Sequence, residues 1–550
     1  MADGARAGKL KRSVGFYGLM FVSLGSIIGS GWLLGAFNAA KSAGPASILS
    51  WLIAAVMLSN LALVYAELGA AYPVAGGGGR FPYYSHGPIA GFTASWAAWL
   101  QAVFVAPIEV LAAITYINAV DAVRDNFNMI TMADDGTTAL LNNNGLIVAV
   151  ILMGLFTAVN LAGAKFLSES NIFIVVWKTI VPFLAVFVVA GTQFEVSNFT
   201  AGGGFMPKGF HGVFAALAGG VVFALQGFEQ AVHLAGEAKN PKRDLSRAII
   251  SAMAIGAVLY TSLQIVLIGG LNPQHILFNW EKPLGADPAA NSAWYTLALA
   301  LGIGWLAKTL LIDAIISPAG TGVVYVGTSA RLSYAMGEER EMPQILATTN
   351  KRGVPVFSII VCAVVGCIAF GPFKSWNALV NVITGATAIM YAFAPIALAS
   401  LHKIAPDHPR SYRIPAPKIL LPAAFCSANL IIYWGGFEAT WKLVLAMAVG
   451  LTIFGIGAVV VKTDAPKTIR NVVWMAPWLL GHVALGALGG YGGYEVMPDW
   501  IDVAIVLAFA LGIYYFALAT TLTREQSAAE VAKDAHQLEY EELPEARVRA

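Results

Sequence analysis

Glycine and serine residues interrupt the first long apolar stretch of the chain. Residues 15–39 are long enough to cross a bilayer as one helix, which takes about 20 residues. Their segment Gly25-Ser26-Ile27-Ile28-Gly29-Ser30-Gly31 is poor in helix-forming residues. In lipid, an unwound turn is stable only where it lines a cavity, because unpaired backbone groups are costly there. The second half of such a broken helix would direct free N–H groups and partial positive charge at the break, which suits a carboxylate. The alternative is a glycine-rich face against which a neighbouring helix packs.

A second polar interruption lies in the middle of the sixth apolar stretch, residues 211–236. It reads Phe223-Ala224-Leu225-Gln226-Gly227-Phe228-Glu229. Two interrupted spans at corresponding places in the two halves of a chain indicate a transporter with its binding site at the membrane midplane. The pair of interruptions therefore favours a transporter over a simple packing motif.

The composition is that of a membrane protein. Of the 550 residues, 58% are hydrophobic and 12% are charged, whereas soluble globular chains have about 25% charged residues. The formal net charge of +2 gives no reason to expect a nucleic-acid partner. Cys362, Cys367 and Cys426 lie in apolar stretches and lack the spacing of metal ligands or of a disulfide framework. We therefore expect a polytopic membrane protein without a bound metal.

The distribution of basic residues predicts the orientation of the chain. The sequence contains about fourteen apolar stretches that could span a bilayer. Lys and Arg gather in alternate loops such as Lys239–Arg243, which is the pattern of cytoplasmic loops. This pattern predicts a multi-pass protein of the cytoplasmic (inner) membrane with both termini cytoplasmic. On the outer side, we expect a long polar loop at residues 121–144 and a cap helix at Ala289–Leu301.

Four ordered motifs resemble those of the amino acid–polyamine–organocation (APC) superfamily of transporters. They are Gly29-Ser30-Gly31, Tyr65-Ala66-Glu67-Leu68-Gly69-Ala70-Ala71-Tyr72-Pro73, Gly227-Phe228-Glu229 followed by Gly236-Glu237-Ala238-Lys239-Asn240-Pro241-Lys242-Arg243, and Ser329-Ala330-Arg331-Leu332-Ser333-Tyr334-Ala335-Met336. Within the superfamily, Gly31-Trp32 and Tyr83-Tyr84-Ser85-His86-Gly87 are most similar to the bacterial aspartate–proton symporter group.

The resemblance implies an all-α polytopic fold with two inverted five-helix repeats, LeuT-like, in which helices 1 and 6 are broken. The implied divisions are a cytoplasmic N-terminus (1–14), a first repeat (15–192), an inverted second repeat (211–400), four additional transmembrane helices (401–522) and a cytoplasmic tail (523–550).

The resemblance also implies a substrate site between the two breaks. The N–H groups of the first break would bind the α-carboxylate of an amino acid, and carbonyls near Ile27 and Phe223 would bind its α-ammonium group. Phe223 would also act as an aromatic lid, and Gln226 would line the side-chain pocket. The implied substrate-binding residues are Ser26, Ile27, Gly29, Ser30, Gly31, Phe223, Gln226 and Gly227.

Charged residues inside the predicted spans are candidates for proton coupling, because charges within a bilayer are functional by default. Lys178 matches a fifth-span lysine whose ammonium group replaces a bound sodium ion in related transporters; the alternative is that it reaches to the cytoplasmic surface. Glu109, in the middle of the third span, either carries a proton or is a structural carboxylate that is hydrogen-bonded to backbone freed by Pro107. Glu229 resembles the family's proton or gating glutamate after the second break. In the eighth span, Lys308 and Asp313 are expected to form a buried structural pair.

The sequence thus predicts a secondary active transporter that works by alternating access, by proton symport of an acidic amino acid such as aspartate. A neutral amino acid is the second choice of substrate. An amino acid or polyamine exchanger and a membrane nutrient sensor are the alternatives. An enzyme is not expected, because the sequence has no His-Glu-x-x-His zinc motif and no Gly-x-Ser-x-Gly nucleophile elbow. The expected partners are the amino acid and the lipid bilayer, with the proton as coupling ion and no other cofactor.

Overall fold

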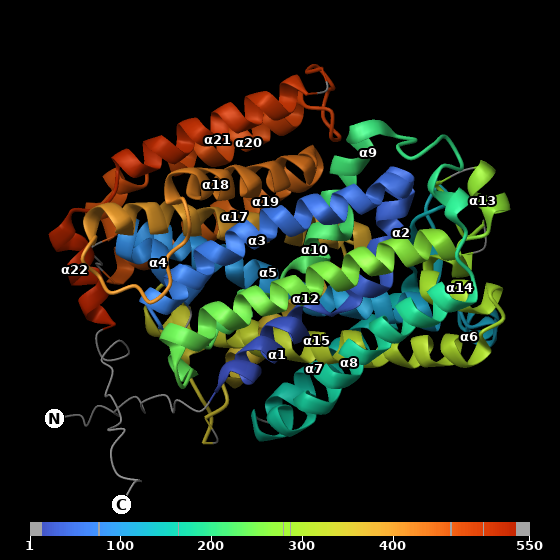
Figure 1. Ribbon diagram of the computed structural model, residues 1–550. Helices are drawn as coiled ribbons and strands as arrows, with labels where there is room; N and C mark the ends of the chain where they lie inside the picture. The colour runs from blue at the N-terminus through green and yellow to red at the C-terminus, as the bar shows by residue number, and fades with distance from the viewer. Residues whose placement is uncertain are drawn as a thin grey trace, which may run out of the picture.

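The chain forms a compact bundle of helices (Figure 1). This computed structural model describes residues 14–74, 77–162, 164–278, 280–285, 288–351, 353–461, 465–498 and 500–534. Nearly all of the predicted N-terminal segment 1–14 and the end of the predicted tail lie outside the described residues. The fold is all-α, as predicted, apart from one short hairpin of strands.

Ten helical segments among the described residues are long and apolar enough to cross a membrane. They are α2 and α3 taken as one run (Ser30–Ala43 and Ser47–Ala71), α5 (Pro88–Ile117), α7 (Asn143–Ala162), α8 (Ala164–Thr192), α12 (Pro241–Gly270), α15 (Gly304–Glu338), α17 (Trp376–Ile404), α18 (Pro417–Trp434), α19 (Phe437–Val461) and α21 (Ile501–Ala519). Shorter apolar segments are α1 (Phe16–Ile27), α9 and α10 (Gly209–Ala216 and Val222–Leu225), α16 (Val356–Ala369) and α20 (Met475–Leu488). Together these segments lie at the predicted apolar stretches, and the number that cross the membrane stays a prediction.

The first predicted break is present between α1 and α2. Ile28 (φ −89°, ψ 89°) and Gly29 (φ −123°, ψ −145°) leave the helical conformation, and α2 begins at Ser30. Glycine is required by close approach here. A Cβ atom on Gly29 would lie 2.7 Å from Oε1 of Glu109, and one on Gly31 would lie 2.7 Å from Cα of Ala224. The break therefore lies against both the third and the sixth span.

The second break is also present, but it is shorter than the predicted interruption. The sixth span contains α9, a π-helical turn at Leu217–Val221 and α10, so Phe223 and Ala224 are still helical. The chain leaves the helix at Gln226 (φ −72°, ψ 159°), and a short helix, α11 (Gln230–His233), follows. Gly227 has φ +114°, and a Cβ atom there would lie 2.8 Å from Ser26. The two breaks are therefore in direct contact with each other.

Long helices surround the two breaks. In the centre of the bundle, α5 packs against both α15 and α17, and α12 packs along α3 and α1. Figure 1 shows α18 to α21 along one side of this core. The helix of the predicted tail, α22 (Arg524–Lys533), packs against α4 (Gly77–His86).

The predicted outer loop and cap helix both contain regular structure. Residues 121–144 include α6 (Asp121–Asn126) and an antiparallel pair of strands, β1 (Ile130–Met132) and β2 (Ala139–Leu141), in which Ile130 pairs with Leu141. The strands were not predicted, because three-residue strands are too short to show an alternating pattern. The predicted cap is present as α14 (Ala293–Ala300), preceded by α13 (Pro273–Phe278) and a 3₁₀ turn at Pro288–Asn291.

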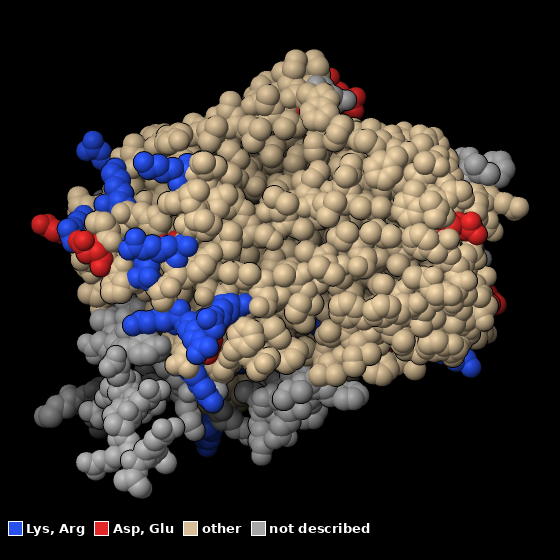
Figure 2. Space-filling model, in the orientation of Figure 1, with Lys and Arg blue, Asp and Glu red and all other residues tan. Residues whose placement is uncertain are grey.

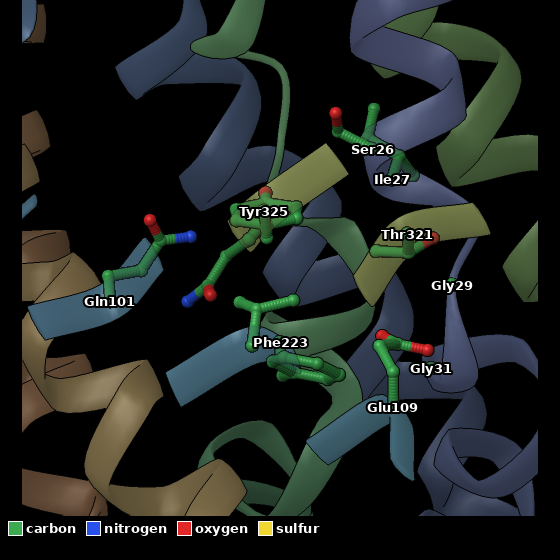
Figure 3. Close-up of a pocket in the computed structure, with 11 residues that line it drawn as sticks. Ser26, Ile27, Gly29, Gly31, Gln101, Glu109, Phe223, Thr321 and Tyr325 are labelled. Atoms are coloured by element: carbon green, nitrogen blue, oxygen red, sulfur yellow. The ribbon is translucent and has the colours of Figure 1, made fainter. Parts of the chain in front are cut away.

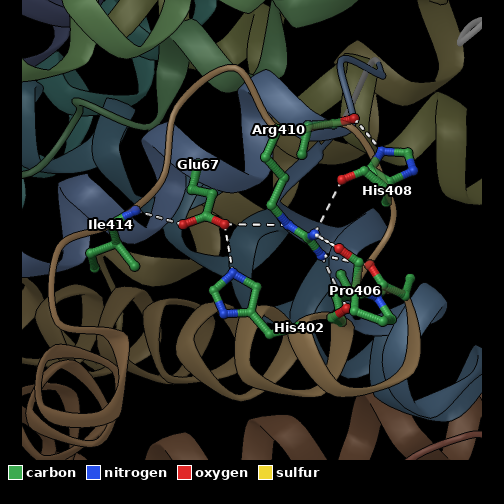
Figure 4. Close-up of polar contacts among 9 residues, drawn as sticks. Glu67, His402, Pro406, His408, Arg410 and Ile414 are labelled. Atoms are coloured by element: carbon green, nitrogen blue, oxygen red, sulfur yellow. Dashed lines mark hydrogen bonds and ion pairs between the residues drawn. The ribbon is translucent and has the colours of Figure 1, made fainter.

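A buried carboxylate ties α3 to the loop after α17. Glu67 is fully buried, and its Oε2 atom accepts a hydrogen bond of 2.7 Å from the backbone N–H of Ile414. Its Oε1 atom lies 2.6 Å from Nε2 of His402 and 3.3 Å from Nε of Arg410 (Figure 4). Arg410 also donates hydrogen bonds to four backbone carbonyls, one in the last turn of α17 and three in the loop after it. This cluster lies at the end of the molecule where Lys and Arg side chains gather, the end that also holds α4 and α22 (Figure 2).

Candidate functional site

A small cavity lies where the two broken spans meet α5 and α15. Figure 3 shows side chains from these elements directed into it. Its lining residues are Ser26, Ile27, Gly29, Gly31, Gln101, Val105, Glu109, Phe223, Gln226, Thr321 and Tyr325. Most of the predicted substrate-binding residues are in this set. The other two, Ser30 and Gly227, are adjacent to it: Ser30 begins α2, and Gly227 packs on Ser26.

The start of α2 is occupied by a carboxylate of the protein itself. The backbone N–H of Ser30 donates a 2.8 Å hydrogen bond to Oε2 of Glu109, and the Ser30 hydroxyl donates one of 3.1 Å to Oε1. Trp376 in turn donates from Nε1 to the Ser30 hydroxyl at 3.1 Å. Glu109 is 1% exposed. The N-terminus of α2, which favours a carboxylate, is therefore already occupied by the side chain of Glu109 in this structure.

The carbonyl groups predicted to bind an α-ammonium group lie at the ends of α1 and α10. The carbonyl oxygen of Ile27 accepts a 2.8 Å hydrogen bond from the hydroxyl of Tyr260, whose ring stacks on Trp51. The carbonyl oxygen of Phe223 accepts from the N–H of Gln226 at 3.2 Å. The carbonyl oxygen of Ile27 also accepts from the N–H of Gly29 at 3.2 Å, whereas that of Phe223 has a second lone pair that can accept one further hydrogen bond. The ring of Phe223 lines the cavity and meets Trp376 edge-on, with centroids 5.7 Å apart.

Lys178 does not reach to the cytoplasmic surface. It is 2% exposed, and its Nζ atom donates a 2.7 Å hydrogen bond to the hydroxyl of Thr321, a residue that lines the cavity. The acidic groups Glu109 and Asp313 attract its charge. A buried cation is thus one hydrogen bond away from the cavity, while its part in proton coupling stays a prediction.

The predicted buried pair of Lys308 and Asp313 is wrong. Asp313 is fully buried, whereas Lys308 is exposed. Asp313 instead accepts hydrogen bonds from Nε1 of Trp32 at 3.1 Å and from the hydroxyl of Ser317 at 2.6 Å. A spacing of five residues places two side chains on different faces of a helix, which is why the pair does not form.

Glu229 holds the second break in shape and is not among the residues that line the cavity. Its Oε2 atom accepts a 3.0 Å hydrogen bond from the N–H of Gly227 and one of 2.6 Å from the hydroxyl of Tyr391. The ring of Tyr391 stacks on Phe228 and meets Tyr65 edge-on. Its predicted role as a proton or gating site stays a prediction.

Polar side chains that the sequence reasoning missed also line the cavity, with Gln101 and Tyr325 away from Glu109 and Thr321 close to Gly29 (Figure 3). Gln226, which was predicted, accepts a 3.1 Å hydrogen bond from Thr387, and its Nε2 atom has no hydrogen-bond partner among the described residues. Helical spacing could have found the missed residues. Gln101 and Glu109 are eight residues apart on α5, and Thr321 and Tyr325 four apart on α15, so each pair shares one face.

Among the residues that the structure describes, the lining of the cavity contains no cluster of metal ligands and no basic residue. Among the described residues, no group of three or more His, Cys, Asp or Glu side chains could hold a metal ion. The lining offers amide, hydroxyl and backbone groups with one carboxylate, which suits a small zwitterion held by hydrogen bonds.

Comparison with known proteins decides the family. The sequence model of the family described as "Amino acid permease" matches residues 14–485. This chain belongs to the amino acid permease family. The match covers both breaks and the whole lining of the cavity, so this permease is a multi-pass, all-helical membrane protein of the APC superfamily.

The relatives of this permease are transporters of several kinds of amino acid. It is 34% identical over 515 residues to the glutamate/serine transporter AimA of Bacillus subtilis, which covers 93% of this chain and 94% of that one. It is 31% identical over 526 residues to the aspartate-proton symporter of the same organism, covering 94% and 98%. The aromatic amino acid transport protein AroP of Escherichia coli is 26% identical over 434 residues, covering 76% and 87%. Transport of an amino acid, rather than an enzymatic reaction, is therefore the activity of this permease.

Proposed function

We propose that this permease moves an acidic amino acid, such as aspartate, together with a proton by alternating access. The observation that carries the proposal is the meeting of two broken spans at one cavity lined by both. Broken spans in corresponding places bring helix ends and free backbone groups to the midplane of a membrane, where a polar substrate is otherwise poorly accommodated.

The proposed pose follows from the polarity of the helix ends. The α-carboxylate binds at the N-terminus of α2, and the α-ammonium group binds near the carbonyl oxygens of Ile27 and Phe223 at the C-terminal ends of α1 and α10. The substrate side chain then lies toward Gln226 and Gln101. The amide of Gln226 has a free Nε2 donor at this place, and a side-chain carboxylate is a strong acceptor for it.

A small neutral amino acid is the second candidate, and one observation favours it. No basic residue of the described part of the chain lines the cavity, and a side-chain carboxylate that is buried without a cation loses its hydration with little compensation. A hydroxyl or amide side chain would meet the same donors at a lower cost. The two relatives with the highest identity above are named for glutamate and serine and for aspartate, so they support both candidates.

Proton coupling is proposed to use the buried acids and the lysine beside the cavity. Glu109 lines the cavity, Lys178 contacts it through Thr321, and Asp313 lies near the same lysine. These groups can exchange protons with a cavity that opens to either side, and the proton is the only coupling ion that we propose. Glu229 is proposed as a gating residue through its bond to Tyr391.

We also propose that both termini are cytoplasmic and that the protein resides in the cytoplasmic membrane. The gathering of Lys and Arg at one end of the molecule supports this orientation (Figure 2). The inverted repeats predicted at 15–192 and 211–400 each begin with a broken span, and helices 1, 2, 6 and 7 are proposed to move against the remaining helices during transport.

Substrate binding and transport can be tested on the purified protein. A thermal-shift screen against the twenty amino acids is expected to give its largest stabilisation with aspartate or glutamate, and competition by serine and asparagine separates the two candidates. In liposomes without internal amino acid, an imposed pH gradient is expected to drive uptake. A strict need for internal amino acid would contradict symport and indicate an exchanger.

A further inference from the structure

We propose that Glu109 occupies the place of the substrate carboxylate, and that each arriving amino acid displaces it and thereby loads it with one proton. This inference rests on the proposed function, because it assumes that an amino acid binds between the two breaks. It adds a specific exchange of carboxylates at the start of α2.

The bonds at the start of α2 show which place is taken. Ser30 is the first residue of a helix of 14 residues, and both its N–H and its hydroxyl donate to the Glu109 carboxylate. These are the donors that the α-carboxylate of a bound amino acid needs in the proposed pose. One N–H cannot donate a full hydrogen bond to two carboxylates at once, so the protein and the substrate compete for it.

The packing allows one carboxylate at a time. A Cβ atom on Gly29 would already lie 2.7 Å from Oε1 of Glu109 and 3.2 Å from the hydroxyl of Thr321. The space beside the break is therefore filled on this side. A substrate carboxylate can enter only if the Glu109 carboxylate moves away from Ser30.

The same cavity holds a second group that lacks a partner. Gln226 is 4% exposed, and its Nε2 atom has no hydrogen-bond partner among the described residues, although Gln226 lines the cavity. A buried donor without an acceptor costs about 1–3 kcal/mol. Its presence indicates that the cavity is shaped for a ligand with an acceptor, independently of Glu109.

The surroundings of Glu109 decide what happens once it is displaced. The polar and charged groups that face it from the neighbouring helices are Ser30 of α2, Lys178 of α8, Tyr260 of α12 and Tyr325 of α15. Lys178 is already bonded to Thr321. A carboxylate that loses two charge-assisted hydrogen bonds in a buried site, with no new cation, takes up a proton instead of remaining ionised.

The exchange balances as a reversible transfer of one proton. Ser30 stops donating to Glu109 and donates to the substrate carboxylate, and Glu109 gains one proton from the water on the side from which the substrate came. When the substrate leaves on the other side, Glu109 returns to Ser30 and releases its proton there. One proton thus moves with each amino acid.

Calorimetry can measure this exchange directly. Titrations of the wild-type protein with its amino acid, repeated in buffers with different ionisation enthalpies at one pH, are expected to show uptake of about one proton per bound molecule. Above the pH at which Glu109 titrates in the protein without bound amino acid, the Kd is expected to rise by about tenfold per pH unit. The Glu109→Gln variant is expected to bind the amino acid without proton uptake and with a Kd that does not depend on pH.

Two controls keep the test decisive. Glu341→Gln removes another buried glutamate, outside the cavity, and is expected to leave the proton uptake unchanged. If Glu109→Gln does not fold, infrared difference spectra of the wild-type protein are expected to show a protonated carboxyl band when the amino acid is added. Binding without proton uptake in the wild type, or proton uptake that persists in Glu109→Gln, would overturn the exchange. Absence of binding by any amino acid would instead overturn the proposed function.

Discussion

Replacing Gly31 by alanine tests whether the two breaks must touch. The new Cβ atom would lie 2.7 Å from both Cα and Cβ of Ala224 in α10, whereas carbon atoms in contact are about 3.5–4.0 Å apart. The two helices must therefore separate by about 1 Å. Because one of the crowded atoms is backbone, a change of rotamer cannot relieve the contact. Overpacking of this kind costs about 1–3 kcal/mol.

The cost is expected to appear in substrate affinity, because α2 and α10 both contribute to the proposed site. If it falls entirely on the bound state, 1–3 kcal/mol corresponds to a Kd that is roughly 5- to 150-fold higher. Equilibrium binding of radiolabelled amino acid to the purified variant measures this change, with thermal unfolding recorded in parallel. Gly154→Ala in α7 is the matched control, since a Cβ atom there meets nothing within 4 Å. Wild-type affinity in Gly31→Ala would refute the idea that the site depends on close contact between the breaks.

Further changes test the charged groups. Lys178→Met is expected to keep amino acid binding but to lower uptake driven by a pH gradient at least about tenfold, because it removes the cation beside the buried acids. An unchanged pH dependence of uptake in liposomes would reject Lys178 as a coupling residue. Glu67→Gln leaves its buried arginine partner uncompensated and is expected to cost about 3–5 kcal/mol in thermal unfolding. Glu438→Gln, which breaks an exposed pair, should change the melting temperature little, and equal losses in the two variants would contradict the account. Burial raises the pKa of Glu341, in the loop after α15, from 4.5 to about 8. Folding therefore favours the protonated form, and the stability of the folded state that is fully present below about pH 4.5 is lost as the pH rises through 8. Protection factors for hydrogen exchange of residues 336–346, which correct for faster intrinsic exchange at high pH, are expected to be lower at pH 8.5 than at pH 6, and a Glu341→Gln variant that kept this difference would contradict the assignment.

The positions of the breaks could be read from the sequence because they depend on local composition. Glycine and serine in place of helix formers located the first break between α1 and α2. The second break was placed correctly but was predicted to be too long, because Phe223 and Ala224 do not differ from ordinary helical residues. Ala224 packs closely against Gly31, which lies far away in the sequence, and a local pattern does not show such a contact.

The partners of the buried charges could not be read from the sequence in the same way. Glu109 was identified as a candidate from its depth in an apolar span, but its bond to Ser30 depends on how α5 lies against α2. Asp313 was paired with the wrong residue because Lys308 is its neighbour in sequence, whereas Trp32 is its neighbour in space. Asp313, Ser317, Thr321 and Tyr325 recur every four residues on α15, and this stripe is the signal that would have directed attention to the cavity.

A structure determined with the transported amino acid bound would test the central claim most directly. We expect the amino acid between the two breaks, with its α-carboxylate accepting a hydrogen bond from the N–H of Ser30 and with Glu109 moved away from that atom. An amino acid bound elsewhere, or one bound in the cavity while Glu109 keeps its bond to Ser30, would contradict the account.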